Sequence, residues 1–140
     1  MRNITVAITV DDRMGIAFNK RRQSRDRVLI ADLCDNTDGV VYVSPYSAPL
    51  FEEYADKVAV VDAPLSDCPN GAVCFLEMTE LKAHVEYISA LTIYRWNRTY
   101  PSDKKLDIDI AGCGFTLTES YDFVGKSHEK ITREIYKKHS

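Results

Sequence analysis

The stretch from Lys20 to Leu33, KRRQSRDRVLIADL, surrounds one carboxylate with five basic side chains and then becomes apolar. The carboxylate belongs to Asp26, and the basic residues are Lys20, Arg21, Arg22, Arg25 and Arg27. We expect a helix to begin here with Ser24 as its N-cap and Asp26 in its first turn, where free N–H groups and the helix dipole favour an acid. This pattern suits an anion-binding site beside a single acid. A solvated, well-capped surface helix is the alternative.

Asp26 is the candidate catalytic residue, and its chemistry depends on its pKa. Burial would raise this pKa, whereas the helix dipole and the adjacent Arg25 and Arg27 would lower it. We expect the lowering to prevail, which gives a fixed anion that can bind a protonated heterocycle or form an ion pair. An acid that only holds the arginines of its own loop is the structural alternative.

Cations and aromatic rings alternate in the segment Tyr94-Arg95-Trp96-Asn97-Arg98, a pattern that can stack nucleobases or make cation–π contacts. On a strand the side chains alternate, so Tyr94, Trp96 and Arg98 would share one face. We expect Trp96 to lie in the core and Arg95 and Arg98 to pair with surface carboxylates. Binding of an anion or a base by these arginines is the alternative.

The three histidines, His84, His128 and His139, are isolated in the sequence. Ser127-His128-Glu129 suggests a catalytic group, but no second base or ligand lies nearby in sequence, and a lone loop histidine is usually solvated or bonded to a neighbour. Glu80 and His84 would share one face of a helix, yet a pair without a third ligand does not define a metal site. We therefore expect no bound metal.

Apolar runs typical of strands buried in a parallel sheet recur through the first two thirds of the chain. They lie at residues 4–10, 40–43, 58–61, 72–76 and 90–96. The basic helix and a short helix at residues 50–55, with Ser47 as its N-cap, are expected between the first three runs. Residues 80–87 predict a weakly amphipathic helix, residues 64–71 a turn-rich connection, and residues 11–19 a loop.

The character of the chain changes after Asn97. Tyr100-Pro101-Ser102-Asp103 breaks the pattern, and residues 115–121 and 130–136 predict two strands joined by DFVGKSHE. The order of elements predicts a single α/β domain over residues 1–140. Its sheet would be mixed and mainly parallel, with an antiparallel C-terminal hairpin.

Composition limits the classes of function. A net charge of −3 and a pI near 5.6 argue against binding nucleic acid over the whole surface and leave only a local basic patch. The apolar run at the N-terminus is too short to span a membrane and lacks a cleavage pattern, so we expect a cytoplasmic protein without membrane attachment. Cys34, Cys68, Cys74 and Cys113 form no C-x-x-C pair, and we expect reduced, mostly buried thiols.

The order of these parts resembles dihydrofolate reductase in a shortened form. VDDRMG looks like that family's first strand running into its active-site loop, and ISALTIYRWNRTYPSD resembles the strand before its aromatic-proline turn. YDFVGKSHEKITREIYKK is similar to the family's closing hairpin. Counted from Gly15, Asp26 falls where the family keeps its single buried pteridine-binding acid. The resemblance implies a dihydrofolate-reductase-like fold and a pocket for a small anionic or heterocyclic ligand around Asp26 and Ser47.

The cofactor half of that family's site is not matched. Where the family has Gly-Arg-x-Thr to hold the cofactor phosphates, this chain has Ser44-Pro45-Tyr46-Ser47, which keeps a hydroxyl and helix N–H groups but no cation. Where the family has a Gly-Gly pair, this chain has Glu77-Met78, which brings a side chain and a negative charge to a place of close approach. The family's tryptophan before the acid falls near Arg21. Binding of NADP thus remains possible, although the family's NADP-binding motifs are missing. We expect no cofactor and a weak or lost reductase activity.

The basic cluster, YRWNRTYP and SHEKIT lie outside the reductase pattern. Together they look like a family of short bacterial chains labelled ribonuclease Z. A zinc nuclease of that type needs a dense His-x-His-x-Asp-His cluster, which this sequence lacks. The alternative function is therefore an RNA- or nucleotide-binding or processing protein that uses the cluster Lys20–Arg27 together with Arg95 and Arg98. No sequence pattern fixes the oligomeric state.

Overall fold

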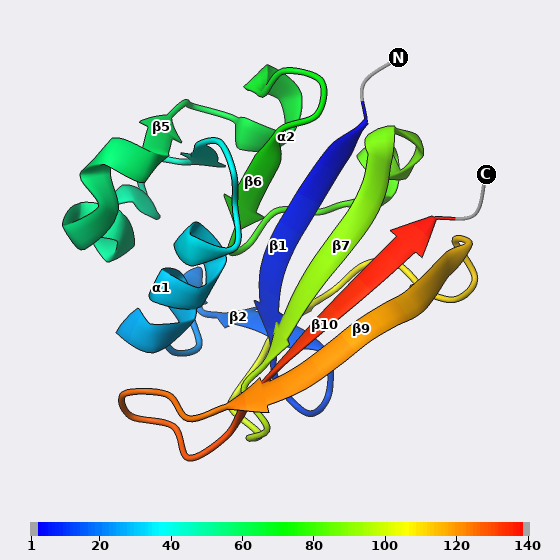
Figure 1. Ribbon diagram of the computed structural model, residues 1–140. Coiled ribbons are helices and arrows are strands. Elements are labelled where there is room, and N and C mark those ends of the chain that lie inside the picture. The colour runs from blue at the N-terminus through cyan, green and yellow to red at the C-terminus, as the bar shows by residue number, and fades with distance from the viewer. Residues whose placement is uncertain (1–2, 139–140) are drawn as a thin grey trace.

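Seven strands form one twisted sheet in the computed structural model, which describes residues 3–138 (Figure 1). They are β1 (Ile4–Val10), β4 (Val41–Val43), β5 (Val58–Val60), β6 (Val73–Leu76), β7 (Ile88–Arg95), β9 (Phe115–Phe123) and β10 (Ile131–Lys138), in the order β5-β4-β6-β1-β7-β10-β9. The first five in this order are parallel, and β10 is antiparallel to both of its neighbours. The predicted α/β fold with a mixed, mainly parallel sheet and an antiparallel C-terminal hairpin is confirmed.

The core lies on both faces of the central strand β1, because nearly every residue of this strand is apolar. Ile4, Val6, Ile8 and Val10 pack into one cluster, whereas Ala7 packs into the other. On the second face, α1 (Arg27–Asp35) and the 3-10 helix η1 (Ala48–Lys57) cover the sheet (Figure 1). Burial of each leucine-sized side chain contributes about 1.5–3 kcal/mol, so this helix layer fixes the position of the head of α1.

A second, small sheet corrects the prediction of a loop over residues 11–19. It contains β2 (Gly15–Phe18), β3 (Arg21–Arg22) and β8 (Lys104–Lys105). The turn between β2 and β3 is formed by Asn19 and Lys20, both with positive φ, at 52° and 59°. Two residues with positive φ make the tight turn that matches the twist of a hairpin, and asparagine tolerates this conformation well. The hairpin divides the basic cluster, because Lys20 lies in its turn and only Arg27 lies within α1.

Several helix boundaries also differ from the predictions. The N-cap of α1 is Asp26, in extended backbone conformation, and not Ser24. The second helix, η1, is longer than predicted and is interrupted by non-helical backbone at Phe51 and Tyr54. The helix predicted over residues 80–87 is the 3-10 helix η2 (Lys82–Tyr87), so Glu80 lies outside it and does not share a helical face with His84. The turn-rich connection contains one helical turn, α2 (Pro64–Asp67).

Two further expectations concern the whole chain. All four cysteines are reduced, with Cys113 half-buried and the others buried, as predicted. Within residues 3–138, no helix has the length and apolar character needed to cross a membrane.

Candidate functional site

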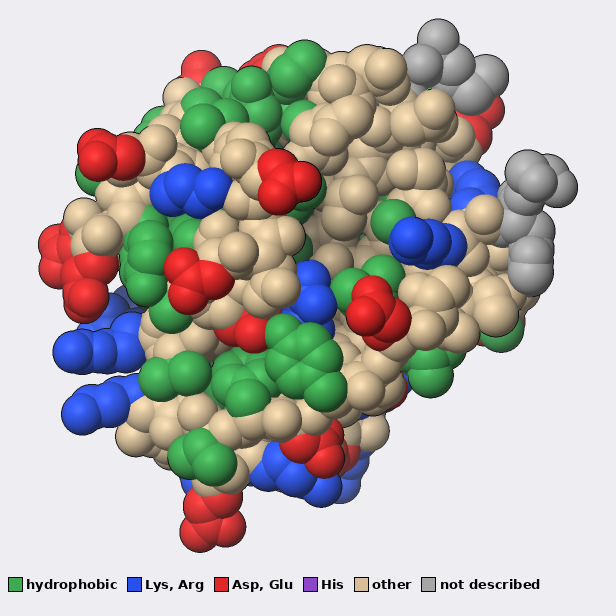
Figure 2. Space-filling view, in the orientation of Figure 1, with side chains coloured by type: hydrophobic (Ala, Val, Ile, Leu, Met, Phe, Trp, Pro, Cys, Tyr) green, Lys and Arg blue, Asp and Glu red, His purple; other side chains and the backbone are tan. Residues whose placement is uncertain are grey.

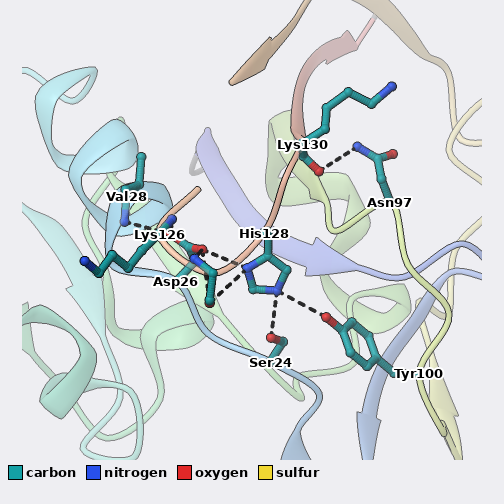
Figure 3. A network of polar contacts seen from close by, with 9 residues as sticks. Ser24, Asp26, Val28, Asn97, Tyr100, Lys126, His128 and Lys130 are labelled. Atoms are coloured by element: carbon teal, nitrogen blue, oxygen red, sulfur yellow. Dashed lines mark hydrogen bonds and ion pairs between the residues drawn. The ribbon is translucent and has the colours of Figure 1, made fainter. Parts of the chain in front are cut away.

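The carboxylate of Asp26 points inward from the head of α1, and its side chain has no solvent exposure. Its Oδ1 accepts hydrogen bonds from the backbone N–H groups of Val28, at 2.9 Å, and Lys126, at 2.8 Å. Its Oδ2 accepts from the N–H of Ser127, at 3.0 Å, and faces Nδ1 of His128 at 2.7 Å (Figure 3). The Ser127 hydroxyl also donates to Oδ2, at 3.5 Å, so the carboxylate has five partners from the protein's own chain, three of them backbone N–H groups.

This environment sets the pKa of Asp26. Burial raises the pKa, but hydrogen bonds outweigh burial and hold the pKa at about 2, below the ordinary value of 3.8. The donors are the N–H of Lys126, the side chain of His128, and the N–H groups of Ser127 and Val28. The predicted lowering is confirmed, but it comes mainly from the β9–β10 loop and not from the flanking arginines. Asp26 is therefore an anion at neutral pH.

His128 is buried, with 4% of its surface exposed, so it is not solvated; it contacts its neighbour Ser127, with Oγ 3.4 Å from Nδ1, but its shorter contacts are with distant residues. Its ring stacks on Trp96, with centroids 4.5 Å apart and planes at 26°. Nδ1 faces Asp26, and Nε2 lies 2.9 Å from the hydroxyl of Ser24 and 3.1 Å from that of Tyr100 (Figure 3). Because the ionised Asp26 can only accept, Nδ1 carries a proton, and in the neutral ring Nε2 is then a hydrogen-bond acceptor.

The loop between β9 and β10 is built to reach Asp26. A Cβ added to Gly125 would lie 2.5 Å from Oδ2 of Asp26 and 2.8 Å from Cδ1 of Ile131, so only glycine fits this close approach. The N–H of Gly125 donates to the carbonyl oxygen of His128 at 2.9 Å, which closes the loop into a tight turn. Sequence reasoning missed His128 because its partners Asp26 and Ser24 are 102 and 104 positions away. Gly125 was the local signal that could have indicated the contact.

A hollow of about 330 Å³ opens beside Asp26, between the head of α1 and η1. Its lining combines three cations, three acids, three apolar side chains and one serine: Arg25, Arg27, Lys126, Asp26, Glu52, Glu53, Ile30, Pro49, Leu50 and Ser127. Figure 2 shows basic and acidic side chains close together at the edge of the molecule where α1 lies in Figure 1. The lining of this hollow therefore carries charges of both signs.

A much smaller space lies on the sheet side of Asp26. It has a volume of about 10 Å³, roughly enough for one water molecule. Ser24, Trp96 and Glu77 line it, and Arg25, Asp26, Ile30 and Leu50 line both this space and the larger hollow. The two spaces therefore share a wall.

Glu77 is a second buried carboxylate, 6% exposed, directly after β6. Its two oxygens accept hydrogen bonds from Nε and Nη2 of Arg22, at 2.6 and 3.0 Å, and Oε2 also accepts from the hydroxyl of Ser47, at 2.7 Å. The Arg22 guanidinium lies 4.4 Å from the ring centroid of Tyr46, and its hydrogen bond to Glu77 raises its pKa. Ser47 precedes η1 as predicted, but its hydroxyl donates to Glu77 and makes no capping bond.

The other candidate residues are dispersed. Arg21 and Arg98 are exposed, and Lys20 lines a separate hollow near Glu80 and Asp103. Arg95 forms an ion pair with Glu134, with Nε and Oε1 2.5 Å apart, as expected for an arginine that pairs with a carboxylate. Trp96 is 2% exposed and lies in the core, which confirms that prediction. The basic residues therefore do not all face one site.

Metal ligands do not gather within the described residues. Between residues 3 and 138, no group of three or more His, Cys, Asp or Glu side chains could hold a metal ion. His139, the third histidine of the sequence, lies outside the described residues.

The sheet order and the buried acid at the head of α1 define a dihydrofolate-reductase-like fold. Among solved structures, the chain is similar to dihydrofolate reductase from Enterococcus faecalis complexed with NADP(H) and RAB-propyl. That match has a TM-score of 0.66 and 10% sequence identity, and it covers 98% of this chain and 96% of the reductase. No protein-family model and no curated protein matches the sequence. The likeness shows the fold, and nothing in these comparisons supports the resemblance to chains labelled ribonuclease Z.

Proposed function

We propose that this dihydrofolate-reductase-like protein binds a small anionic or heterocyclic ligand beside Asp26 and has lost NADPH-dependent reduction. The observation that carries the proposal is the hollow of about 330 Å³ between α1 and η1, into which Asp26 and three cations are placed. Its volume lies at the lower end of the range for small-molecule sites, roughly 300–1,000 Å³.

The lining of the hollow favours an anion. Arg25 and Arg27 offer planar guanidinium groups that can bind a carboxylate or phosphate through two parallel hydrogen bonds, and Lys126 adds a third positive charge. The apolar side chains of Ile30 and Leu50 can pack against a ring or an aliphatic chain. A ligand with an apolar body and an anionic group can therefore pair with these cations, and Glu52 and Glu53 in the same lining limit the anionic charge that the hollow accepts.

Asp26 itself is not available to a protonated heterocycle. Its hydrogen-bond partners come from Val28, Lys126, Ser127 and His128, and a ligand ring would have to displace the β9–β10 loop to reach the carboxylate. A reductase that holds its substrate through this acid needs the carboxylate free. This internal saturation supports the loss of reductase activity.

The residues at the ends of β4 and β6 do not fit NADP. A cofactor diphosphate needs hydrogen-bond donors and positive charge. Here the Glu77 carboxylate would repel it, and both Arg22 and the Ser47 hydroxyl already donate to Glu77. We therefore infer that the protein works without NADP.

Titration with folate and NADPH tests the proposal, with the fluorescence of Trp96 as the signal. Trp96 is the only tryptophan, and it stacks on His128, which is bonded to Asp26 in the wall of the hollow. We expect saturable quenching by folate, which carries both a ring and carboxylates, and no response to NADPH. Saturation by NADPH together with turnover of dihydrofolate would contradict the proposal. A flat response to folate would exclude a folate-like ligand in this hollow.

The RNA- or nucleotide-binding alternative stays a prediction. Of its candidate residues, Arg22 is bonded to Glu77 and Arg95 to Glu134, so neither guanidinium is free for a phosphate. If RNA were the partner, binding at low salt would weaken steeply as salt rises and would be lost in an Arg21→Ala/Arg22→Ala variant.

A further inference from the structure

Ser24, His128 and Asp26 form a continuous chain of hydrogen bonds. The Ser24 hydroxyl lies 2.9 Å from Nε2 of His128, and Nδ1 of the same ring lies 2.7 Å from Oδ2 of Asp26 (Figure 3). These residues come from the segment before α1 and from the β9–β10 loop, so the fold brings them together. A hydroxyl, an imidazole and a buried carboxylate in this order are the groups that activate a serine in acyl transfer.

We propose that Ser24 is a nucleophile, that His128 is its general base and that Asp26 orients the imidazole. The carboxylate is held by three backbone N–H groups, and the ring is held by its stack on Trp96. Neither group needs to move before it acts. Ser24 is half-buried, and it lines the small space that shares a wall with the hollow beside α1.

Asp26 has the properties that are needed to orient the imidazole of His128. It stays ionised because its pKa lies near 2, so it fixes the proton of the neutral ring on Nδ1 and leaves the lone pair of Nε2 for a hydroxyl proton. When His128 takes that proton, the adjacent carboxylate stabilises the imidazolium.

Tyr100 adds a second hydroxyl on the same nitrogen, 3.1 Å from Nε2. One lone pair accepts one proton, so Ser24 and Tyr100 cannot both donate to Nε2 at the same time. When Ser24 donates, the Tyr100 O–H is free to donate to an oxyanion that forms beside the ring, a role that tyrosine side chains fill in acyl-transfer sites.

The reaction balances with an ester and water as co-reactants. The Ser24 Oγ forms a bond to the acyl carbon, its proton passes to Nε2, and the electron pair of the carbonyl double bond moves to oxygen. The carbonyl re-forms, the bond to the alcohol breaks, and Nε2 returns the proton to that alcohol. Water then attacks the acyl-serine by the same route and releases the acid.

The substrate class follows from the neighbouring hollow, and this one point rests on the proposed function. Arg25, Arg27 and Lys126 favour an ester that carries a carboxylate or a phosphate. The activation of Ser24 does not depend on that preference.

A fluorophosphonate probe tests the nucleophile directly, because it needs no knowledge of the substrate. Ser24 Oγ would displace fluoride from phosphorus, with its proton taken by His128. We expect one adduct by intact mass, mapped to Ser24 by peptide mass spectrometry and absent in Ser24→Ala. Ser120→Ala is the matched control, because Ser120 is an exposed serine on β9, and we expect it to leave the labelling rate unchanged.

The base is tested with His128→Asn, whose amide can still donate to Asp26 but cannot accept the serine proton. We expect labelling of Ser24 to slow roughly 100-fold or more, the usual range for loss of a general base. Tyr100→Phe removes the proposed oxyanion donor but keeps the base, so we expect labelling of Ser24 to slow by less than in His128→Asn. Thermal unfolding of each variant shows that it is folded. The proposal would be overturned if Ser24 of the folded wild-type protein were labelled no faster than the exposed Ser120. It would also be overturned if Ser24 were labelled equally fast in folded His128→Asn.

Discussion

Two buried carboxylates, Asp26 and Glu77, line the same small space, and different groups stabilise their negative charges. Glu77 is bonded to a full positive charge, Arg22, and to a serine hydroxyl. Asp26 is bonded to three backbone N–H groups and an imidazole. An arginine stays charged and closes the Glu77 site, whereas an imidazole can gain and lose a proton. The Glu77 site therefore has fixed charges, whereas the Asp26 site contains a group that can exchange a proton.

The largest effect is expected from Asp26→Asn. The amide nitrogen would face two N–H donors and leave both without an acceptor, and each buried unsatisfied donor costs about 1–3 kcal/mol. We expect a loss of about 4 kcal/mol in the free energy of unfolding, measured by urea denaturation. Asp38→Asn, in an exposed loop, is the control and should change stability by less than about 0.5 kcal/mol. A loss below about 1 kcal/mol for Asp26→Asn would mean that this carboxylate is solvated.

Low pH should destabilise the protein by protonating the same carboxylate, that of Asp26. The folded pKa of Asp26 is about 2 and the ordinary value is 3.8, so its contribution is fully present above the ordinary pKa and is lost as pH falls toward 2. This difference corresponds to about 2 kcal/mol. Urea denaturation at a series of pH values should show this loss in the wild type, and Asp26→Asn should lack it. Parallel pH curves for the two proteins would contradict the pKa assignment.

Glu77→Gln should have a smaller effect than Asp26→Asn. The amide keeps a bond to Ser47 or Arg22, and Arg22 is 23% exposed, so water can solvate the guanidinium that loses its partner. We expect about 1.5 kcal/mol lower stability. Glu80→Gln is the control, because the side chain of Glu80 is 72% exposed and its pair with Lys104 should be worth less than about 1 kcal/mol. If Glu77→Gln lowered the free energy of unfolding more than Asp26→Asn does, the expected order of the two acids would be wrong.

The smallest effect concerns the ligand. Arg25→Ala and Lys126→Ala each remove one cation from the exposed side of the hollow, and we expect folate binding to weaken about tenfold with each, equal to about 1.4 kcal/mol. Arg21→Ala, outside the hollow, should leave the Trp96 titration unchanged. Equal losses of folate affinity in all three variants would indicate long-range electrostatic attraction and not a defined binding site.

The parallel part of the sheet was predictable because its strands are apolar runs that can be recognised in the local sequence. The lowered pKa of Asp26 was also predicted, but only the bond from the Val28 N–H belongs to the helix start, and the larger causes lie in the distant β9–β10 loop. The hairpin formed by β2 and β3 was missed because positive φ at Asn19 and Lys20 leaves only a weak local signal. That error made the basic cluster look like one surface.

The partners of the two acids could not be predicted from local patterns. Asp26 meets His128 at a separation of 102 residues, and Arg22 meets Glu77 at 55, because the order of the strands brings their loops together. A histidine in a hairpin loop is ordinarily exposed, but the close approach of Gly125 to Asp26 and the stack on Trp96 accompany the burial of this one.

The most direct test of the account is the protonation of the His128 ring near neutral pH, observed by nitrogen–proton NMR correlation. With Asp26 ionised and bonded to Nδ1, we expect a proton on Nδ1 with a downfield signal that exchanges slowly with water and is absent in His128→Asn. A ring without a proton on Nδ1, or an Nδ1 proton that exchanges as fast as that of free imidazole, would contradict a carboxylate held by the protein's own loop.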